Sequence, residues 1–245
     1  MKRLLLALLV CTGCDKLFGV ERIDLGIDAA SCDPFNEDGD RFGNACDACP
    51  ADADDGTDVD ADEIGDLCDP DRMMAGDRMV LFDGFDTNVN PWTITGGWQR
   101  QNGAFELGTT SDSRVELSPV SARVPTMLAV IPTYSVISNG GITIFGSMGG
   151  SDVRCSVTGT PGNETLSISA FLINDNKPLT GTGPLRIYGG QRRDGHYYCR
   201  ARHGANFDVD VTSAVSDQIR TIDKIGIVTS QTSATVTSVT LYDVP

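Results

Sequence analysis

An acidic block at residues 32–71 is the feature that most constrains this chain. It contains 15 acidic residues and a single base, Arg41, so it contributes −14 to the formal net charge of −15 carried by all 245 residues. Large apolar side chains are sparse in the block, and so little buried surface cannot offset the conformational entropy lost on folding. The block is therefore either a solvated, disordered linker or a segment that a cation and cross-links hold in shape. Its negative charge argues against nucleic acid as a partner.

Two windows of twelve residues repeat one pattern within this block, and they begin 22 residues apart. They are NEDGDRFGNACD, which starts at Asn36, and DVDADEIGDLCD, which starts at Asp58. Side-chain oxygens occupy positions 1, 3, 5, 9 and 12 of both windows; these residues are Asn36, Asp38, Asp40, Asn44 and Asp47, and then Asp58, Asp60, Asp62, Asp66 and Asp69. Alternating short carboxylates turn their oxygens into a tight loop, to which position 7 adds a backbone carbonyl, and this is the ligand pattern of calcium. We therefore expect these side chains to bind calcium as a cofactor.

The two windows differ from EF-hand loops, because position 6, which needs Gly for a sharp turn, is Arg41 or Glu63. They resemble the thrombospondin type 3 repeat, a family that strings C-P…D-x-D-x-D-G-x-G-D-x-C-D units into a calcium-wrapped, disulfide-stapled rod. The resemblance covers CPADADDGTDVDADEIGDLCDP at residues 49–70 and, as a poorer copy, CDPFNEDGDRFGNACD at residues 32–47. It implies that residues 32–72 form a stiff calcium-dependent spacer, whose folding is coupled to metal binding.

The N-terminus reads MKRLLLALLVCTGC, with two basic residues followed by an apolar run at residues 4–10. This run is too short to span a bilayer as a mature helix. The stretch resembles the lipobox of bacterial lipoproteins, which implies that residues 1–13 are a signal peptide and that Cys14 is lipidated. Residues 14–31 would then tether the protein to a membrane of the cell envelope. The expected location is the outer membrane or the cell surface. An ordinary secretory signal, cut elsewhere, is the alternative.

Export places the remaining six cysteines in an oxidising compartment, where an even number favours three disulfides. They are Cys32, Cys46, Cys49, Cys68, Cys155 and Cys199. The last two are the only cysteines of the C-terminal part and are expected to pair, and the acidic block can pair its own four as Cys32–Cys46 and Cys49–Cys68. A zinc site that uses Cys46 and Cys49 is an alternative, but it would leave the surrounding carboxylates unexplained.

Residues 77–245 show short alternating runs separated by Gly, Asn, Asp and Pro, and no long stretch has helical periodicity. Strands are expected at residues 114–118, 141–146, 154–159, 165–173, 185–190, 196–201, 206–212, 224–230 and 234–244. Many short strands at regular spacing predict an all-β, antiparallel sandwich or barrel. Its two tryptophans, Trp92 and Trp98, are expected in the core.

The opening LFDGFDTNVNPWTITGGWQRQNGAFEL and the closing SVTLYDVP resemble the concanavalin A-like, or laminin-G-like, jelly rolls. The resemblance implies a lectin-like domain at residues 77–245. This family includes glycosidases, but the E-x-D-x-x-E pattern is missing here and Glu106, Glu116 and Glu164 stand alone. His196 and His203 have no nucleophile that the sequence identifies as their partner. We therefore do not expect an enzyme.

A basic and aromatic patch, RIYGGQRRDGHYYCRARH, occupies residues 186–203. If Cys199 points inward to a disulfide, side chains at alternate positions share the outer face of its strand. Arg154, beside Cys155, is expected next to them. The predicted ligand row is therefore Arg154, His196, Tyr198, Arg200 and Arg202. A solvated sheet face with long polar side chains is the alternative.

These features together predict an exported, lipid-anchored protein of the cell envelope. A calcium-stiffened spacer would hold out a β-sandwich that binds a glycan or a neighbouring surface component. A purely structural envelope protein and a degenerate glycosidase remain as alternatives.

Overall fold

The computed structural model describes residues 35–87, 90–108, 112–123, 125–148, 151–170, 173–204, 209–215 and 221–244. The predicted signal peptide, the lipidation site Cys14 and the tether lie outside the described residues, as does Cys32. Among the helical residues that the structure describes, none belongs to a helix long and apolar enough to cross a membrane.

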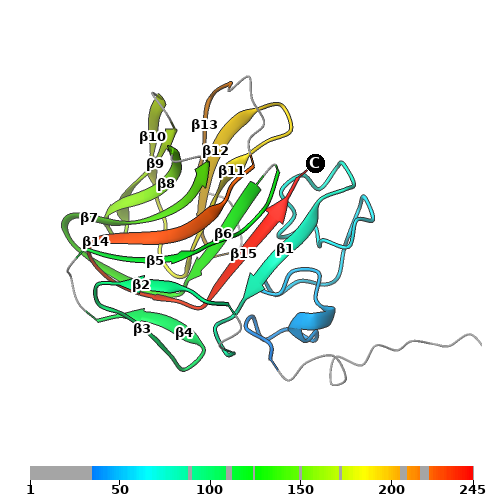
Figure 1. Ribbon diagram of the computed structural model, residues 1–245, viewed down its shortest axis with the longest axis horizontal. Coiled ribbons are helices and arrows are strands. Elements are labelled where there is room, and N and C mark those ends of the chain that lie inside the picture. The colour runs from blue at the N-terminus through cyan, green and yellow to red at the C-terminus, as the bar shows by residue number, and fades with distance from the viewer. Residues whose placement is uncertain are drawn as a thin grey trace, which may run out of the picture.

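The expected all-β class is confirmed, because two antiparallel sheets make up the C-terminal part (Figure 1). The six-stranded sheet has the order β1 (Arg78–Asp83), β15 (Ser238–Asp243), β6 (Pro125–Ile131), β11 (Leu185–Gln191), β12 (His196–His203) and β13 (Val209–Val215). The nine-stranded sheet has the order β10 (Ile173–Leu179), β9 (Asn163–Ala170), β8 (Ser151–Thr160), β7 (Thr133–Met148), β14 (Lys224–Val236), β4 (Ala104–Leu107) and β3 (Trp98–Gln101). On its other branch, β5 (Ser113–Leu117) pairs with β14, and β2 (Thr93–Thr95) pairs with β5.

The main core lies between the two sheets, where alternate residues of each strand face inward. Trp98 is buried there and Trp92 packs partly buried against it, as expected from the sequence. The predicted Cys155–Cys199 disulfide is present and joins β8 of one sheet to β12 of the other. Both sulfur atoms are therefore inside the sandwich, and the link crosses its core.

Several features of the strands differ from the sequence expectation, and one is that β10 includes residues 174–179, for which no strand was expected. Residues 224–230 and 234–236 belong to one continuous strand, β14, and the chain passes to the other sheet at Thr237, where β15 follows. Strand β6 was not expected at all. Every residue of β6 is buried, so its sequence, PTMLAVI, lacks the polar alternation of a half-exposed strand.

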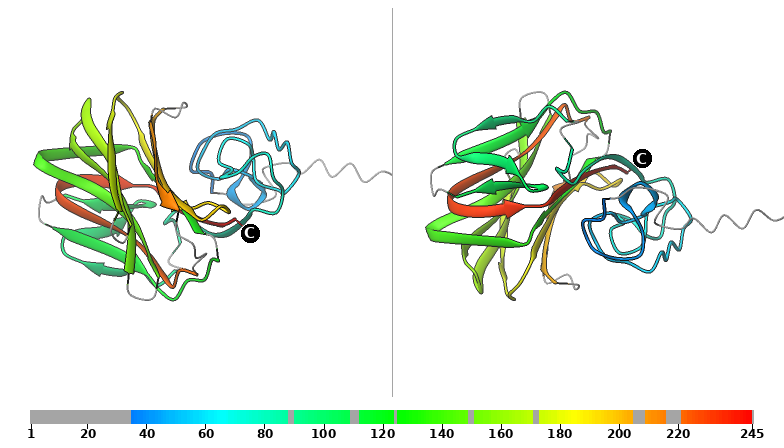
Figure 2. Two further views of the ribbon diagram at one scale, coloured as in Figure 1. Left: turned by 90° about the horizontal axis from the view of Figure 1, so that it is seen from above. Right: turned by 90° about the horizontal axis from the view of Figure 1, so that it is seen from below.

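The acidic block covers the outer face of the six-stranded sheet, and this explains the burial of β6. We include in the block the residues that follow it as far as residue 77. From residue 35 to residue 77 the chain is irregular apart from a short 3-10 helix, η2 (Asn44–Cys46), and it forms a third layer beside the sandwich (Figure 2). A second apolar cluster lies between them. From the block it contains Cys49, Ala51, Ile64 and Cys68, and from the sheet it contains Leu128, Val130, Tyr188, Tyr198 and Tyr242.

The prediction of a spacer that holds the sandwich at a distance is therefore wrong for the described part of the block. The block has few apolar side chains of its own. They pack against apolar side chains on the outer face of the sheet, so the block does not remain extended. The predicted Cys49–Cys68 disulfide is confirmed and lies in this interface. Cys46 is also disulfide-bonded.

A buried ion network fixes the block on the sheet. Asp52 of the block is 2 % exposed, and its Oδ2 lies 2.7 Å from Arg202 Nη2, a side chain that is 1 % exposed. Arg186 forms a second ion pair with Asp52, and the Tyr188 hydroxyl donates to Asp52 Oδ2 at 3.1 Å. Burial raises the pKa of Asp52, whereas the two arginines lower it. A buried charge is tolerated only with such partners, so this network specifies where the block packs.

Candidate functional site

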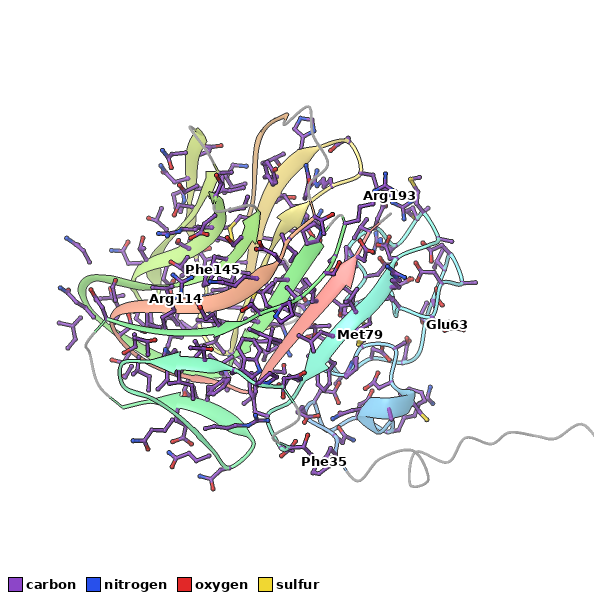
Figure 3. The ribbon with its side chains drawn as sticks, in the orientation of Figure 1. Phe35, Glu63, Met79, Arg114, Phe145 and Arg193 are labelled. Carbon is purple, nitrogen blue, oxygen red and sulfur yellow. A yellow bond between two sulfur atoms is a disulfide. The ribbon has the colours of Figure 1, made fainter. Side chains whose placement is uncertain are left out.

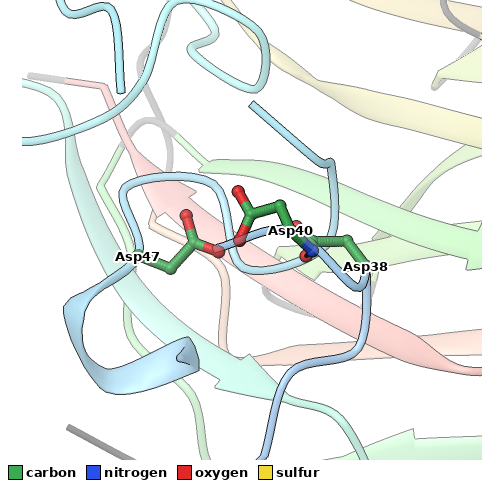
Figure 4. Close-up of side chains that lie close together, drawn as sticks. All are labelled: Asp38, Asp40 and Asp47. Carbon is green, nitrogen blue, oxygen red and sulfur yellow. Dashed lines mark hydrogen bonds between the residues drawn. The ribbon is translucent and has the colours of Figure 1, made fainter. Parts of the chain in front are cut away.

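The first predicted loop brings three of its carboxylates together. Oxygen atoms of Asp38, Asp40 and Asp47 all lie within 4.8 Å of one another (Figure 4). Asp54 lies at the same place, since its amide donates to Asp40 Oδ2 at 3.3 Å and its charge acts on Asp47. We call these four residues the first carboxylate cluster.

The second loop forms an equivalent group. Oxygen atoms of Asp58, Asp60 and Asp62 lie within 4.8 Å of one another. Asp69 and Asp77 adjoin them, because both interact electrostatically with Asp62, and the Asp77 amide donates to Asp62 Oδ2 at 2.8 Å. These five residues are the second carboxylate cluster.

In five of the nine carboxylates of the two clusters, one oxygen accepts a hydrogen bond while the other is buried without such a partner among the described residues. Asp47 Oδ1 accepts from the Cys49 amide at 2.7 Å, and Asp69 Oδ1 accepts from the Asp71 amide at 2.7 Å. The unpartnered Oδ2 atoms are those of Asp38, Asp47, Asp54, Asp69 and Asp77, and Asp60 has both oxygens in this state. Buried oxygens without partners are rare in folded proteins, and a hard cation is the ligand that satisfies several of them at once.

The electrostatics of the two clusters favour a bound cation. Burial raises the pKa of Asp47 to about 7, with a further contribution from the charges of Asp38, Asp40 and Asp54. Burial likewise raises the pKa of Asp69 to about 7, and Asp77 adds to the rise. Two carboxylates about 5 Å apart repel by roughly 3 kcal/mol at an effective dielectric constant of about 20. A divalent cation between them removes this cost.

Three of the ten predicted ligands are not members of the two carboxylate clusters and accept hydrogen bonds from loop amides, as Asp40, Asp58 and Asp62 within the clusters also do. Asn36 Oδ1 accepts from the Gly39 amide at 2.6 Å, Asn44 Oδ1 accepts from the Glu37 amide at 3.4 Å, and Asp66 Oδ1 accepts from the Val59 amide at 2.9 Å. These hydrogen bonds stabilise the turns from which the clustered carboxylates project. Short polar residues commonly stabilise loops in this way.

Sequence reasoning missed Asp54 and Asp77, because both lie outside the twelve-residue windows. Asp54 follows Asp47 by seven residues, and Asp77 follows Asp69 by eight. The spacing gives no common signal, because the residue eight positions after Asp47 is the exposed Asp55.

The two loops also share an unusual backbone conformation. Position 4 has positive φ in both, 77° at Gly39 and 63° at Ala61, and position 6 of the second loop has it too, 76° at Glu63. The left-handed region is costly for residues with a Cβ, so Ala61 and Glu63 are strained, and the two loops share this conformation at position 4 alone.

The predicted ligand row is divided by the structure. Tyr197, Cys199 and Ala201 point into the main core, as expected, so the alternate residues of β12 face outward. Tyr198 and Arg202 are buried there beneath the acidic block, at 3 % and 1 % exposure. His196 and Arg200 are half-buried.

Arg154 does not lie beside the other four residues of the row, and that part of the prediction is wrong. Its strand, β8, belongs to the nine-stranded sheet, whereas β12 belongs to the six-stranded sheet. Because the Cys155–Cys199 bond crosses the interior, the neighbours of the two cysteines point to opposite outer surfaces. Arg154 forms an exposed ion pair with Asp152 at 2.9 Å.

A groove of about 370 Å³ lies where the acidic block meets the β11–β12 hairpin, and we call it the seam groove. Its lining includes Asp71 and Met74 from the block, and Arg192, Arg193, Tyr198 and Arg200 from the sheet. The guanidinium groups of Arg192 and Arg200 lie 5.2 and 5.1 Å from the centre of the Tyr198 ring. Both also bond to Asp210 Oδ2, at 2.9 and 3.0 Å. Two residues of the predicted row thus line a hollow built from both parts of the chain.

No protein-family model matches this sequence, and no curated protein matches it significantly. Solved structures do share its fold. The CBM2 module of the evolved Dit of Lactobacillus casei BL23 phage J-1 aligns with a TM-score of 0.55 at 8 % identity, over 68 % of this chain and 95 % of that one. The legume lectin-like domain from Entamoeba histolytica aligns with a TM-score of 0.51 at 10 % identity, over 64 % of this chain and 91 % of that one.

A third structure with this fold is an enzyme. SCLam, a non-specific endo-beta-1,3(4)-glucanase from family GH16, aligns with a TM-score of 0.51 at 8 % identity, over 69 % of this chain and 92 % of that one. The sandwich therefore has the lectin-like jelly-roll fold that the sequence suggested. Identities this low show the fold alone, because one fold carries many functions.

Proposed function

We propose that this chain is an exported, lipid-anchored, calcium-binding surface protein whose jelly-roll domain binds a glycan. The observation that carries the calcium part is the set of buried carboxylate oxygens without partners in the two carboxylate clusters. Oxygen donors in this number, on irregular loops, suit calcium, which accepts six to eight ligands in flexible geometry. The cysteines support this choice over zinc, since Cys46, Cys49 and Cys68 are disulfide-bonded and offer no thiolate.

The glycan part of the proposal is supported by the lectin-like fold together with the seam groove. The groove offers guanidinium, carboxylate and apolar groups side by side, and sugar sites use this mixture. A purely structural envelope protein is the main alternative, and it predicts that no soluble ligand binds.

A degenerate glycosidase is the less favoured alternative. Glu116 accepts from Arg114 at 2.6 Å and from Lys224 at 3.2 Å, whereas the buried Glu164 accepts from the Tyr134 hydroxyl. Carboxylates occupied separately in this way do not suggest the paired acid and nucleophile of a glycosidase. Hydrolysis of any polysaccharide by the purified chain would contradict the proposal of a binding protein.

Calcium binding is tested by calorimetric titration of the metal-free protein. Asp60→Asn should weaken binding by about 10–100-fold, the loss typical when a metal site is disturbed, since both oxygens of Asp60 face the second cluster. Asp55→Asn is the matched control, because the Asp55 side chain is exposed and accepts from Thr57, while the bond from Arg41 goes to the Asp55 backbone carbonyl and is kept in the variant. Asn36→Ala should also have a smaller effect than Asp60→Asn. Equal affinities in all four proteins would refute the assignment of the second cluster.

The lipid anchor is tested separately at Cys14. Cys14→Ala should abolish acyl labelling and release the protein from membranes, because several acyl chains are needed for firm anchoring. Membrane association that survives this change would refute the anchor without affecting the calcium sites.

A further inference from the structure

Asp77 connects the second carboxylate cluster to the seam groove. It is 2 % exposed, and its Oδ1 accepts a hydrogen bond from Arg193 at 2.6 Å. Its Oδ2 is buried and receives no hydrogen bond from an N–H donor among the described residues, while the carboxyl lies within hydrogen-bonding reach of Asp69 and close to the charge of Asp62. One buried carboxylate thus lies between a candidate cation position and a guanidinium that lines the groove.

Arg193 holds the tip of the β11–β12 hairpin to the acidic block. Besides Asp77, it donates to the Met74 carbonyl at 2.9 Å (Figure 3 labels Arg193 at this junction). The turn that carries Arg193 is closed by a bond of 2.9 Å from the Gly195 amide to the Arg192 carbonyl. The position of the groove wall therefore depends on the position of residues 74–77.

We propose that a cation in the second carboxylate cluster makes the seam groove competent to bind a neutral glycan, through Asp77 and Arg193. This inference rests on the calcium and glycan binding proposed above. With the cation bound, Asp77 is held in place, and Arg193 is held against the groove. Without it, the carboxylates repel one another and residues 74–77 lose their fixed position, so the block side of the groove is lost.

The chemistry of the groove indicates a neutral ligand. Each of its arginines already has a carboxylate: Arg193 has Asp77, and Arg192 and Arg200 share Asp210. Asp71 and Asp194 also line the hollow and would repel an anion. A sugar hydroxyl both donates and accepts, so it bonds to guanidinium and carboxylate alike, and Met74 offers an apolar contact to a sugar ring.

The test uses the purified chain on an array of neutral oligosaccharides, with forms bearing uronic acid or sulfate beside them. Each variant is applied with calcium and with a chelator, and its calcium affinity is measured by titration. Arg193→Gln is the diagnostic variant, because it removes the link without removing a carboxylate from the cluster. Arg114→Gln is the matched control, since Arg114 stacks on Phe145 at 4.2 Å on the nine-stranded sheet, away from the seam (Figure 3).

The wild-type chain and Arg114→Gln should bind neutral glycans at least about tenfold more tightly with calcium, within the usual range of coupling between sites. Arg193→Gln should still bind calcium but should show the weak glycan binding of the chelated protein under both conditions. Because coupling is reciprocal, the bound glycan should raise the calcium affinity of the wild type by the same factor.

Glycan binding that ignores calcium would overturn the inference and leave the proposed function standing. Calcium-dependent binding that persists in Arg193→Gln would overturn the link through Asp77. Selective binding of the acidic forms would overturn the neutral class. If calcium binds but no glycan does under either condition, the glycan part of the proposed function fails together with this inference.

Discussion

The sandwich and the acidic block are stabilised in opposite ways. The sandwich buries apolar side chains between two sheets, and its cross-link, Cys155–Cys199, lies inside that core. The block has almost no interior of its own. It contributes a disulfide, Ala51 and Ile64 to a surface that the sheet provides, and it gathers carboxylates into two clusters. A chain segment with too little apolar surface to fold alone can therefore become ordered as a layer on a neighbouring sheet.

This contrast has a consequence for the sheet itself. In a two-layer sandwich the outer face of each sheet meets water, and its strands alternate. Here β6 and β15 are buried along their whole length. Leu128, Val130 and Tyr242 face the block, while Met127, Ala129 and Leu241 face the main core. The ordering of the acidic block and the burial of the outer sheet face therefore depend on each other. Substitutions in either region are expected to disturb this interface.

The largest effect is expected from Asp52→Ala, which breaks the buried network between block and sheet. Loss of one partner leaves Arg202 buried without its charge partner, and this typically costs about 3–5 kcal/mol. Urea unfolding in the presence of calcium measures the loss. Asp55→Ala, in the same segment but exposed, should change stability by less than about 0.5 kcal/mol. Similar values for the two variants would mean that the network does not anchor the block.

A somewhat smaller effect is expected when Cys49 and Cys68 are both replaced by Ser. The bond joins residues 19 apart in sequence, and for a loop of this size the chain-entropy estimate is about 3 kcal/mol. Limited proteolysis should then cut the block between residues 50 and 67 while the sandwich resists. The matched double change at Cys155 and Cys199 should weaken the sandwich and leave the calcium affinity of the block unchanged. A cut pattern shared by both variants would show that the two regions unfold as one.

Acidification should weaken calcium binding, because burial raises the pKa of Asp47 and of Asp69 to about 7 in the metal-free protein. At pH 6 each carboxyl holds its proton, and calcium must displace it, so affinity should fall by about tenfold per site between pH 8 and pH 6. Calorimetry in buffers of different ionisation enthalpy should detect the released protons. In the metal-free protein the pH dependence of stability has the opposite direction. Asp47 and Asp69 hold protons in the folded state that they have lost in the unfolded chain, so the free energy of unfolding falls as pH rises from about 4 towards 7. A pH-independent affinity would mean that these carboxyls do not face the cation.

The smallest effect is expected at Ala61. Gly39 and Ala61 occupy the same position of the two loops with φ of 77° and 63°. Ala61→Gly should stabilise the second loop by about 0.5–1 kcal/mol, because it relieves left-handed strain that exceeds the entropy cost of Gly. Gly39→Ala is the reciprocal change and should destabilise the first loop. Thermal unfolding of the calcium-bound protein compares the two, and a destabilising Ala61→Gly would refute the strain argument.

Features encoded in short stretches could be predicted from the sequence. The two windows revealed most members of the carboxylate clusters, because alternating aspartates on a tight loop converge whatever lies around them. The cysteine count led to Cys49–Cys68 and Cys155–Cys199, and alternating runs located most strands of the sandwich. The same local logic placed Tyr198 and Arg202 on the outer face of β12, opposite Cys199, and the structure agrees.

Features that depend on which surfaces meet could not be predicted in this way. Strand β6 was missed because its polar alternation disappears when both of its faces are covered. Asp77 lies outside the repeat and belongs to a cluster only because the chain folds back on Asp62. Arg154 was placed beside the wrong strand, because a disulfide predicted from counting does not reveal that it joins two sheets rather than neighbours in one.

The sequence by itself determined the all-β class, the acidic repeats and the pairings Cys49–Cys68 and Cys155–Cys199, since each follows from residue types and their spacing or number along the chain. Only the tertiary structure decided that the repeats are a layer rather than a spacer, and that Asp52, Arg186 and Arg202 meet under it. The physical reason is that burial of a charge or an apolar face is a property of two surfaces in contact. The outward-facing side chains of β12 resemble a ligand-binding face when the strand is considered alone. The acidic block covers Arg202, whereas Tyr198 and Arg200 remain in the wall of the seam groove.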